Sequence, residues 1–414
     1  RTFLSEGYNC TEAWNSRLGA PFMQNANLDQ LYYNMDQRYQ QNKKISAIDV
    51  DIFVNRVEGN THLEEVADLV HKLRQTEETS ATLDSTGHAV IRNFLDADHT
   101  EDLLQILNNR LGYGVFLDHY IASYGLNKLI KANDFKSAAQ IASMLMLQED
   151  FSNELSKALS LYACFKYAKS PDIKPIGKET TEEPKDEVKV RVKFLRNPYF
   201  DDHFDLDDPN LLIGKTMDML GDTLDDPLRT NFKLVGLTLY QKFSKATAII
   251  DSSEKYITKE LAIVAQNILK KYEGAFKENE EYDQLSSRIE TLLSKQLKES
   301  QYEEELKKFI KDAVEKHEKT EIQQQNDLYK MWCTNRESAL QAELSRLQRV
   351  QRLENVERLT KEMEEEEQKL WFFENEEKIE LEIESKKVYY PKRWFGKKKK
   401  PRVVDEDYVP PEIR

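Results

Sequence analysis

Three stretches of the first 170 residues share one hydrophobic pattern: a helical periodicity, a short polar turn and a second helical periodicity. The turns fall at 58–61, 96–100 and 132–134, and each is followed by an apolar pair three residues apart. The first members of these pairs, Val66, Leu103 and Ala138, recur at a period of roughly 37 and then roughly 35 residues. This period predicts helical hairpins over 45–168 that stack as a solenoid, since one hairpin cannot bury its apolar stripe alone. An ordinary helical bundle with evenly spaced loops is the alternative.

The segments on both sides of the repeats carry their own patterns. Residues 1–44 are rich in aromatic residues, Asn and Gln, and 27–39 has helical periodicity. We expect an ordered N-terminal arm that packs on the first repeat or on a partner. After the third repeat, 153–167 gives one more apolar helix with no obvious second half, which we expect to cap the solenoid.

The composition and the hydrophobic pattern change twice over residues 169–300. Pro, Gly, Lys and Glu mark 169–208 as a linker, in which 188–194 alternates apolar and basic residues and should be extended. Helical periodicity returns at 210–221, 228–250, 257–271 and 285–297. We therefore predict a second helical module over 209–300, without a recognisable copy of the repeat. A degenerate continuation of the solenoid is the alternative.

A long charged helix is predicted over 301–387, because no Pro or Gly interrupts 304–387 and Glu, Lys, Gln and Arg dominate it. Its apolar residues step by three, so each falls about 60° short of a full turn and the stripe spirals around the helix. Such a stripe argues against a sustained two-stranded coiled coil and favours one helix that touches different neighbours along its length. Alternation at 379–384 leaves an extended far end open. The stepping residues are Leu344, Leu347, Val350, Leu353, Val356 and Leu359.

Composition narrows the class of protein. The 414 residues carry a net charge of -14, so any contact with nucleic acid must be local. No apolar run approaches the roughly 20 residues that span a bilayer, and we expect no membrane partner. Three widely spaced cysteines suggest free thiols in a reducing compartment. The chain starts at Arg1 without an initiator methionine, which we interpret as removal of an upstream segment.

A search for catalytic patterns returns nothing specific. Gly214-Lys215-Thr216 mimics the end of a phosphate-binding loop, but Pro209 stands where the leading Gly would be. The seven histidines show no metal-ligand spacing, and no Ser sits in a nucleophile elbow. We expect no catalytic residue, no metal, no cofactor and no small-molecule substrate, and therefore no enzyme.

The tail at 388–414 is basic and then acidic. Cations interleaved with Tyr and Trp suit phosphate contact and stacking on exposed bases. The alternatives are a nuclear-import-like signal, a nonspecific solvated tail, or binding to the acidic run 364–367 of another copy. The candidate RNA contacts here are Lys386, Lys387, Lys392, Arg393, Trp394, Lys397, Lys398, Lys399, Lys400 and Arg402.

The third repeat carries a resemblance to a known family. It resembles the pentatricopeptide-repeat family of the small subunit of animal mitochondrial ribosomes, numbered twenty-seven in the small-subunit series. The long charged helix, with Trp332 near its start, is similar to the C-terminal helix of that family, whereas the basic tail is an addition. The resemblance is carried by Tyr113-Gly114-Val115-Phe116, Asp118, Leu129-Ile130-Lys131, Asp134-Phe135-Lys136-Ser137-Ala138, Met146, Gln148-Glu149, Phe151 and Ser160-Leu161-Tyr162.

The resemblance implies an all-α, pentatricopeptide-like solenoid in an imported protein of the mitochondrial matrix, built into the ribosomal small subunit. Its partners would be small-subunit ribosomal RNA and neighbouring ribosomal proteins. Ser123 and Asn127 are candidates for base-reading positions. Charge alone adds Arg110, Lys128, Lys131 and Lys136 as phosphate contacts. The alternatives are a free factor that binds particular mitochondrial transcripts and a coiled-coil adaptor with no RNA role.

Overall fold

The computed structural model describes residues 3–173, 203–204, 206–274, 276, 279–295 and 302–387. Over these residues the protein is helical, with seventeen α-helices, which confirms the all-α solenoid class and the long C-terminal helix. The chain divides into two compact units, Arg1–Leu340 and Gln341–Arg414, and α17 (Tyr302–Ser385) contributes to both. The predicted extended segment 188–194 and the tail from 388 onward lie outside the described residues.

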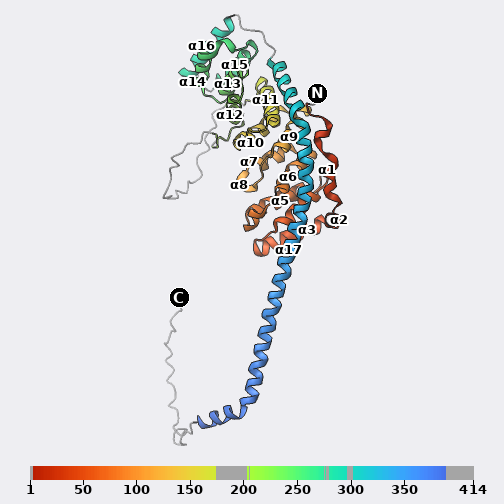
Figure 1. Cartoon of the computed structure of the whole chain (residues 1–414). Coiled ribbons are helices and arrows are strands. Elements are labelled where there is room, and N and C mark those ends of the chain that lie inside the picture. Colours follow the sequence, from red (N-terminus) through yellow and green to blue (C-terminus); the bar gives the residue numbers. More distant parts are fainter. Residues whose placement is uncertain are drawn as a thin grey trace, which may run out of the picture. The chain divides into compact units, whose positions relative to one another are not determined.

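Helical hairpins stack in the first unit as the hydrophobic period predicted (Figure 1). The first helices begin 37, 35 and 35 residues apart, and neighbouring first helices pack on one another, as do the second helices α7 and α10. The first helices are α4 (Ala47–Arg56), α6 (Asp84–Asp96), α9 (His119–Ala132) and α11 (Glu154–Lys169). The second helices are α5 (Leu63–Arg74), α7 (Thr100–Asn108) and α10 (Phe135–Leu147).

Capping side chains set where three of these helices begin. An oxygen of Asp118, Asp134 or Asn153 accepts the backbone N–H three residues further on, at 2.8, 3.1 and 2.8 Å. Each bond satisfies one of the free N–H groups at a helix start. The turn between α9 and α10 is closed by Asn133, whose left-handed backbone (φ 62°) ends α9. Local sequence therefore fixes the hairpin boundaries.

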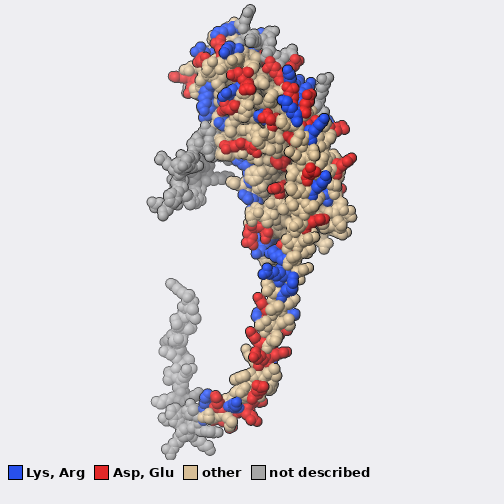
Figure 2. Space-filling model, in the orientation of Figure 1, with Lys and Arg blue, Asp and Glu red and all other residues tan. Residues whose placement is uncertain are grey.

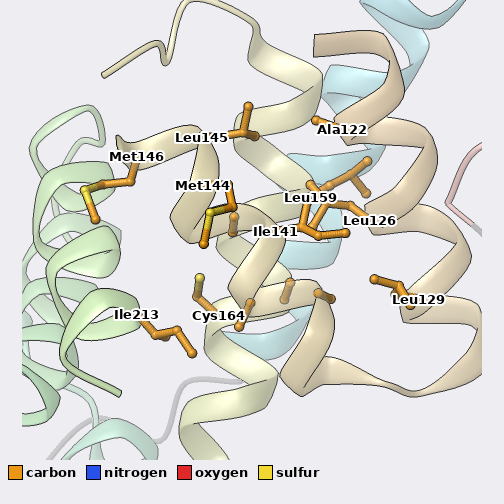
Figure 3. Packing of buried hydrophobic residues seen from close by; sticks show 14 of the residues in the cluster. Ala122, Leu126, Leu129, Ile141, Met144, Leu145, Met146, Leu159, Cys164 and Ile213 are labelled. Carbon is orange, nitrogen blue, oxygen red and sulfur yellow. The ribbon is translucent and has the colours of Figure 1, made fainter. Parts of the chain in front are cut away.

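The core of the third repeat lies between α9, α10 and α11 (Figure 3). Ala138 and Ala139 are fully buried, and their small side chains let α10 lie close to its neighbours. Figure 3 shows Leu126, Ile141 and Leu159 gathered from the three helices. This core is the one that the apolar spacing predicted.

The helix over 153–167 does not cap the solenoid. The second helices α10 and α12 (Pro209–Asp222) pack together, and α12 also contacts α11, so α12 supplies the missing second half from beyond the linker. Ile213 of α12 points toward α11 and Met146 of α10 lies beside α12 (Figure 3). The capping prediction is wrong because the partner helix is more than 39 residues away along the chain, where no local pattern connects the two.

Two further hairpins follow α12. They are formed by α13 (Leu228–Leu239) with α14 (Phe243–Ser253), and by α15 (Lys259–Tyr272) with α16 (Glu280–Ser294). The prediction of one helix over 228–250 is wrong, because Gln241 adopts a left-handed backbone (φ 61°) that separates α13 from α14. Both α13 and α15 also contact α11, so the packing continues from the third repeat without a gap in the described helices.

The two ends of the described chain are also helical. α3 (Leu28–Asn42) belongs to the predicted N-terminal arm and packs on α4 and α5, the two helices of the first repeat. At the other end, residues 379–384 belong to α17, so the extended alternative for this stretch is wrong. The alternation of Glu with Ile and Leu there does not overcome the helix propensity of an uninterrupted charged segment.

The crossing of α12 and α13 depends on Gly214. A Cβ at this position would lie 2.5 Å from the backbone N of Tyr240 and 2.8 Å from the carbonyl O of Gly236. Gly214→Ala should therefore lower the free energy of unfolding by about 1–3 kcal/mol, despite the better helix propensity of Ala. Urea unfolding followed by circular dichroism measures the change.

Gly87 of α6 is the matched control, since a Cβ there meets no other atom within 4 Å. Gly87→Ala should leave stability unchanged or raise it by up to about 1 kcal/mol. Equal midpoints for Gly214→Ala and the unmodified protein would contradict the close crossing.

Candidate RNA and protein interface

One face of the stacked hairpins is formed by the first helices, and the chain itself covers this face. The cover consists of α17 up to Leu340 and of the N-terminal segment from residue 3 to α2 (Pro21–Gln24), which includes α1 (Thr11–Ser16). α17 runs along the stacked hairpins (Figure 1). Its side chains meet α11, α6 and α4 in turn. We call α17 residues 302–340 and residues 3–24 together the cover.

The contact with the first repeat is a buried ion pair. Asp51 of α4 accepts a hydrogen bond from Arg336 Nε at 2.5 Å, and both side chains are almost completely buried. Its other carboxylate oxygen accepts from Ser85 Oγ at 2.6 Å, Thr86 Oγ1 at 2.7 Å and Asn55 Nδ2 at 3.1 Å. A buried carboxylate needs such a full set of donors to offset its loss of hydration.

The second repeat meets the cover through a polar network around Tyr329. Arg92 Nη1 donates to the hydroxyl oxygen of Tyr329, and Arg92 Nη2 donates to the carbonyl of Asn9. The Tyr329 hydroxyl lies 2.9 Å from His88 Nε2, and His88 Nδ1 lies 2.8 Å from Asp118. Burial raises the pKa of Tyr329 to about 12, so its hydroxyl keeps its hydrogen at neutral pH.

The third repeat is covered by the start of the chain. The backbone N–H groups of Phe3 and Leu4 both donate to Asn127 Oδ1 at 3.3 Å, and the Tyr120 hydroxyl donates to the carbonyl of Tyr8. Ser123 is fully buried beneath this segment. The hypothesis that Ser123 and Asn127 read bases is wrong for this structure, because Asn127 is bonded to the protein's own backbone and Ser123 is buried.

The contact between α17 and α11 is a half-buried cluster of opposite charges. Glu303 lies 2.7 Å from Lys166, 3.0 Å from Lys169 and 2.8 Å from Lys307. Partial burial raises the pKa of Glu303, but hydrogen bonds from Lys166, Lys307 and Lys169 outweigh it and lower the pKa to about 2. The cover is therefore fixed electrostatically at both ends, at Glu303 and at Arg336.

The four predicted phosphate contacts of the repeats do not lie in one cluster. Lys128 pairs with Asp98 at 2.9 Å and Lys136 pairs with Asp172 at 2.8 Å. Arg110, in α8 (Arg110–Tyr113), and the exposed Lys131 have no carboxylate within ion-pair distance among the described residues. Arg110 and Lys131 are therefore the two of these four cations that form no ion pair with a described carboxylate.

Of the predicted tail contacts, two are described. Lys386 and Lys387 follow the end of α17 and lie 3.3 Å from Glu382 and 3.9 Å from Glu384. The others fall outside the described residues: Lys392, Arg393, Trp394, Lys397, Lys398, Lys399, Lys400 and Arg402.

Sequence reasoning missed a cationic stretch in the second unit. Over 344–361, α17 holds five Arg or Lys residues against two Glu, and every side chain is exposed. Arg346, Arg349 and Arg352 follow one another at steps of three, with no acidic residue between 344 and 353. Figure 2 shows basic side chains giving way to acidic ones along this part of α17. The net charge of -14 does not reveal this stretch, because it sums these cations with the acidic residues that follow them.

A metal site and a membrane-spanning helix are two further features that the described residues could contain. Among them, no group of three His, Cys, Asp or Glu side chains could hold a metal ion. In the same residues, no helix is both long and apolar enough to cross a membrane.

Comparison with known protein families shows to which of them this chain belongs. The sequence profile of the Mitochondrial 28S ribosomal protein S27 family matches residues 1–362. The chain belongs to this family. The match spans the hairpins, the cover and the cationic stretch, and it confirms the resemblance seen in the third repeat. Membership places the chain in the small subunit of the mitochondrial ribosome, in the matrix, in a family of ribosomal proteins, which are typically not enzymes.

Removing Arg336 tests whether the cover holds the first repeat. Arg336→Met leaves Asp51 buried without a cation and should lower the free energy of unfolding by about 3–5 kcal/mol, measured by urea denaturation. Adding Asp51→Asn should restore part of the loss, because the buried charge is then gone. Arg358→Met, at an exposed position of the same helix, should change stability by less than about 0.5 kcal/mol. A similarly small effect of Arg336→Met would contradict the ion pair.

The Glu303 cluster predicts a pH-dependent contribution. Because its pKa is lowered from 4.5 to about 2 in the folded protein, its stabilisation is complete above pH 4.5 and disappears as the pH falls towards 2. Glu303→Gln should destabilise the protein by about 1–3 kcal/mol at pH 7, and this difference should shrink below pH 4.5. Glu305→Gln, exposed on the same turn, is the control. Thermal melts of the three proteins between pH 7 and 3 provide the measurement, and a constant difference across this range would refute the prediction.

Proposed function

We propose that this chain is a structural component of the mitochondrial ribosomal small subunit. It docks on small-subunit ribosomal RNA and on neighbouring ribosomal proteins, supports mitochondrial translation and catalyses no reaction. The observation that carries the proposal is the family match over residues 1–362. The helical architecture suits this role, since stacked hairpins offer long surfaces on which partners assemble.

The covered face constrains where RNA can dock. Pentatricopeptide-type base reading needs open positions on the first helices, but here these helices contact the cover through Asp51, His88, Tyr120 and Asn127. RNA therefore approaches other surfaces, and recognition rests on phosphate contact and shape instead of on a base code.

The cationic stretch of α17 is the surface that we assign to phosphate contact. Arg346, Arg349 and Arg352 are exposed, rise about 4.5 Å from one to the next along the helix axis, and turn about 60° between steps. Arg346 donates to Glu343 at 2.8 and 2.6 Å and would have to exchange this carboxylate for a phosphate. Arginine guanidinium groups bind phosphate oxygens in a planar, two-bond geometry. An exposed helix that carries three of them within seven residues can follow an RNA backbone without reading its sequence.

The cations predicted from the sequence complete the proposal. Arg110 and Lys131 are available for phosphate contact, whereas Lys128 and Lys136 would have to leave Asp98 and Asp172. The tail cations, from Lys386 to Arg402, stay proposed RNA contacts on the strength of their charge.

A free factor that binds particular mitochondrial transcripts is the second candidate function. Its support is the hairpin period, which is that of solenoids with one base read per repeat. Two observations count against it: Ser123 is buried and Asn127 is bonded to the backbone of Phe3, whereas a sequence-specific factor needs both positions open.

Sedimentation separates the two functions. Mitochondrial lysate is run on sucrose gradients at low and at high salt, and this chain is located by immunoblotting. An integral ribosomal component co-migrates quantitatively with the small subunit and stays with it at high salt, since salt removes contacts that are purely electrostatic. Migration in light fractions, or release on raising the salt, would refute the structural role and favour the transcript factor.

The arginine site is tested with the purified full chain and small-subunit ribosomal RNA in filter-binding assays. Replacing Arg346, Arg349 and Arg352 together by Gln should weaken binding and reduce the slope of log K against log salt by about 2 to 3. The control replaces Lys242, Lys245 and Lys255, exposed near α14, by Gln, which changes the net charge equally. Equal losses in both variants would leave only a nonspecific effect of net charge and overturn the assignment.

A further inference from the structure

The far part of α17 is exposed and strongly acidic. Residues 362–385 hold eleven Glu against two Lys, and all their side chains are exposed except Asn375 and Ile379, which are half-buried. The family match ends at residue 362, so family membership assigns no role to this segment. We call residues 362–385 the acidic end of α17.

An apolar belt interrupts the acidic end. Leu370, Trp371, Phe372 and Phe373 are consecutive, and Trp371 and Phe373 are 59 % and 67 % exposed. Successive helix residues are about 100° apart, so these four side chains surround about 300° of the helix. A single partner helix lies along one stripe and could cover only part of such a belt. Its occupant must therefore wrap around α17 or approach it from several sides.

The charges beside the belt select the kind of occupant. Four consecutive carboxylates, 364–367, precede it, and Glu374, Glu376 and Glu377 follow it. Nucleic acid, anionic lipid and a second copy of this acidic segment would all be repelled. A polypeptide that carries both Lys or Arg and apolar side chains would be attracted by the carboxylates and would bury the aromatic rings.

We propose that the acidic end of α17 is a docking site for a basic, apolar segment of a neighbouring ribosomal protein. The inference rests on the proposed function for the source of the partner, but the chemistry of the site does not depend on it. The aromatic belt supplies the buried anchor, as Trp and Phe do at the centres of protein interfaces, and the glutamates form the charged rim. α17 then holds RNA through residues 344–361 and protein through residues 362–385.

A direct binding experiment tests the chemistry without the ribosome. The probes are two fluorescent 20-residue peptides of equal apolar content, one built of Lys, Leu and Tyr and the other of Glu, Leu and Tyr. The full chain should bind the basic peptide, and Trp371→Ala with Phe373→Ala should weaken this binding at least tenfold by fluorescence anisotropy. Leu344→Ala with Leu347→Ala, exposed apolar residues of the cationic stretch, should leave it unchanged. Binding of the acidic peptide that the Trp371→Ala, Phe373→Ala variant weakens to the same extent, or equal losses of basic-peptide binding in both variants, would overturn the site.

A second experiment uses purified small subunits. A carbodiimide joins carboxylates to lysine amines in direct contact, and mass spectrometry identifies the joined residues. The glutamates of the acidic end should be joined to lysines of another ribosomal protein, with at least a fivefold loss in the Trp371→Ala, Phe373→Ala variant. Links only to this chain's own lysines, links between two copies, or no links would overturn the proposal. Absence of the chain from the subunit would refute the proposed function alone, since the peptide result stands independently.

Discussion

A carboxylate removed from water must be given a cation, and Asp51 receives its cation from a residue 285 positions further along the chain. This pairing with Arg336 requires α17 to return from the last hairpins to the first repeat. Once α17 is held there, Tyr329 lies against Arg92 and His88, and Glu321 lies against Tyr8 and Asn153. The cover is thus a consequence of satisfying polar groups on the first helices, in addition to burying their apolar residues.

Local elements of this structure were predictable, whereas the cover was not. The hairpins, their turns and the long helix follow from helical periodicity and capping residues such as Asp134 and Asn153, which act within a few positions of themselves. The association of α12 with α10 and α11 could not be predicted, because the chain between α11 and α12 is long and carries no matching pattern. One signal was available in α4, where Asp51 stands among the apolar residues Val50 and 52–54 and therefore requires a distant partner.

The candidate interface shows how averages over a sequence mislead. Base-reading positions were assigned by analogy with solenoids whose first helices are open, but Asn127 accepts hydrogen bonds from the backbone of Phe3 and Leu4. The net charge of -14 indicated that any contact with RNA is local but not where it lies, and α17 separates a cationic stretch from an acidic one within about forty residues. Opposite charges placed next to each other along one exposed helix allow two partners of different chemistry to be held side by side.

The order in which the chain is synthesised gives the cover a further meaning. When the protein is made or imported N-terminus first, the hairpins of residues 47–169 are complete long before Tyr329 and Arg336 arrive. Until then Asp51 has no counter-ion and the apolar residues around it face solvent. The early solenoid is therefore a folding intermediate with an exposed apolar surface that is prone to aggregate. Nearest-neighbour stacking would let such a solenoid fold repeat by repeat. Here α17 covers the solenoid last, so the first repeat reaches its final structure only after the C-terminal third of the chain is present.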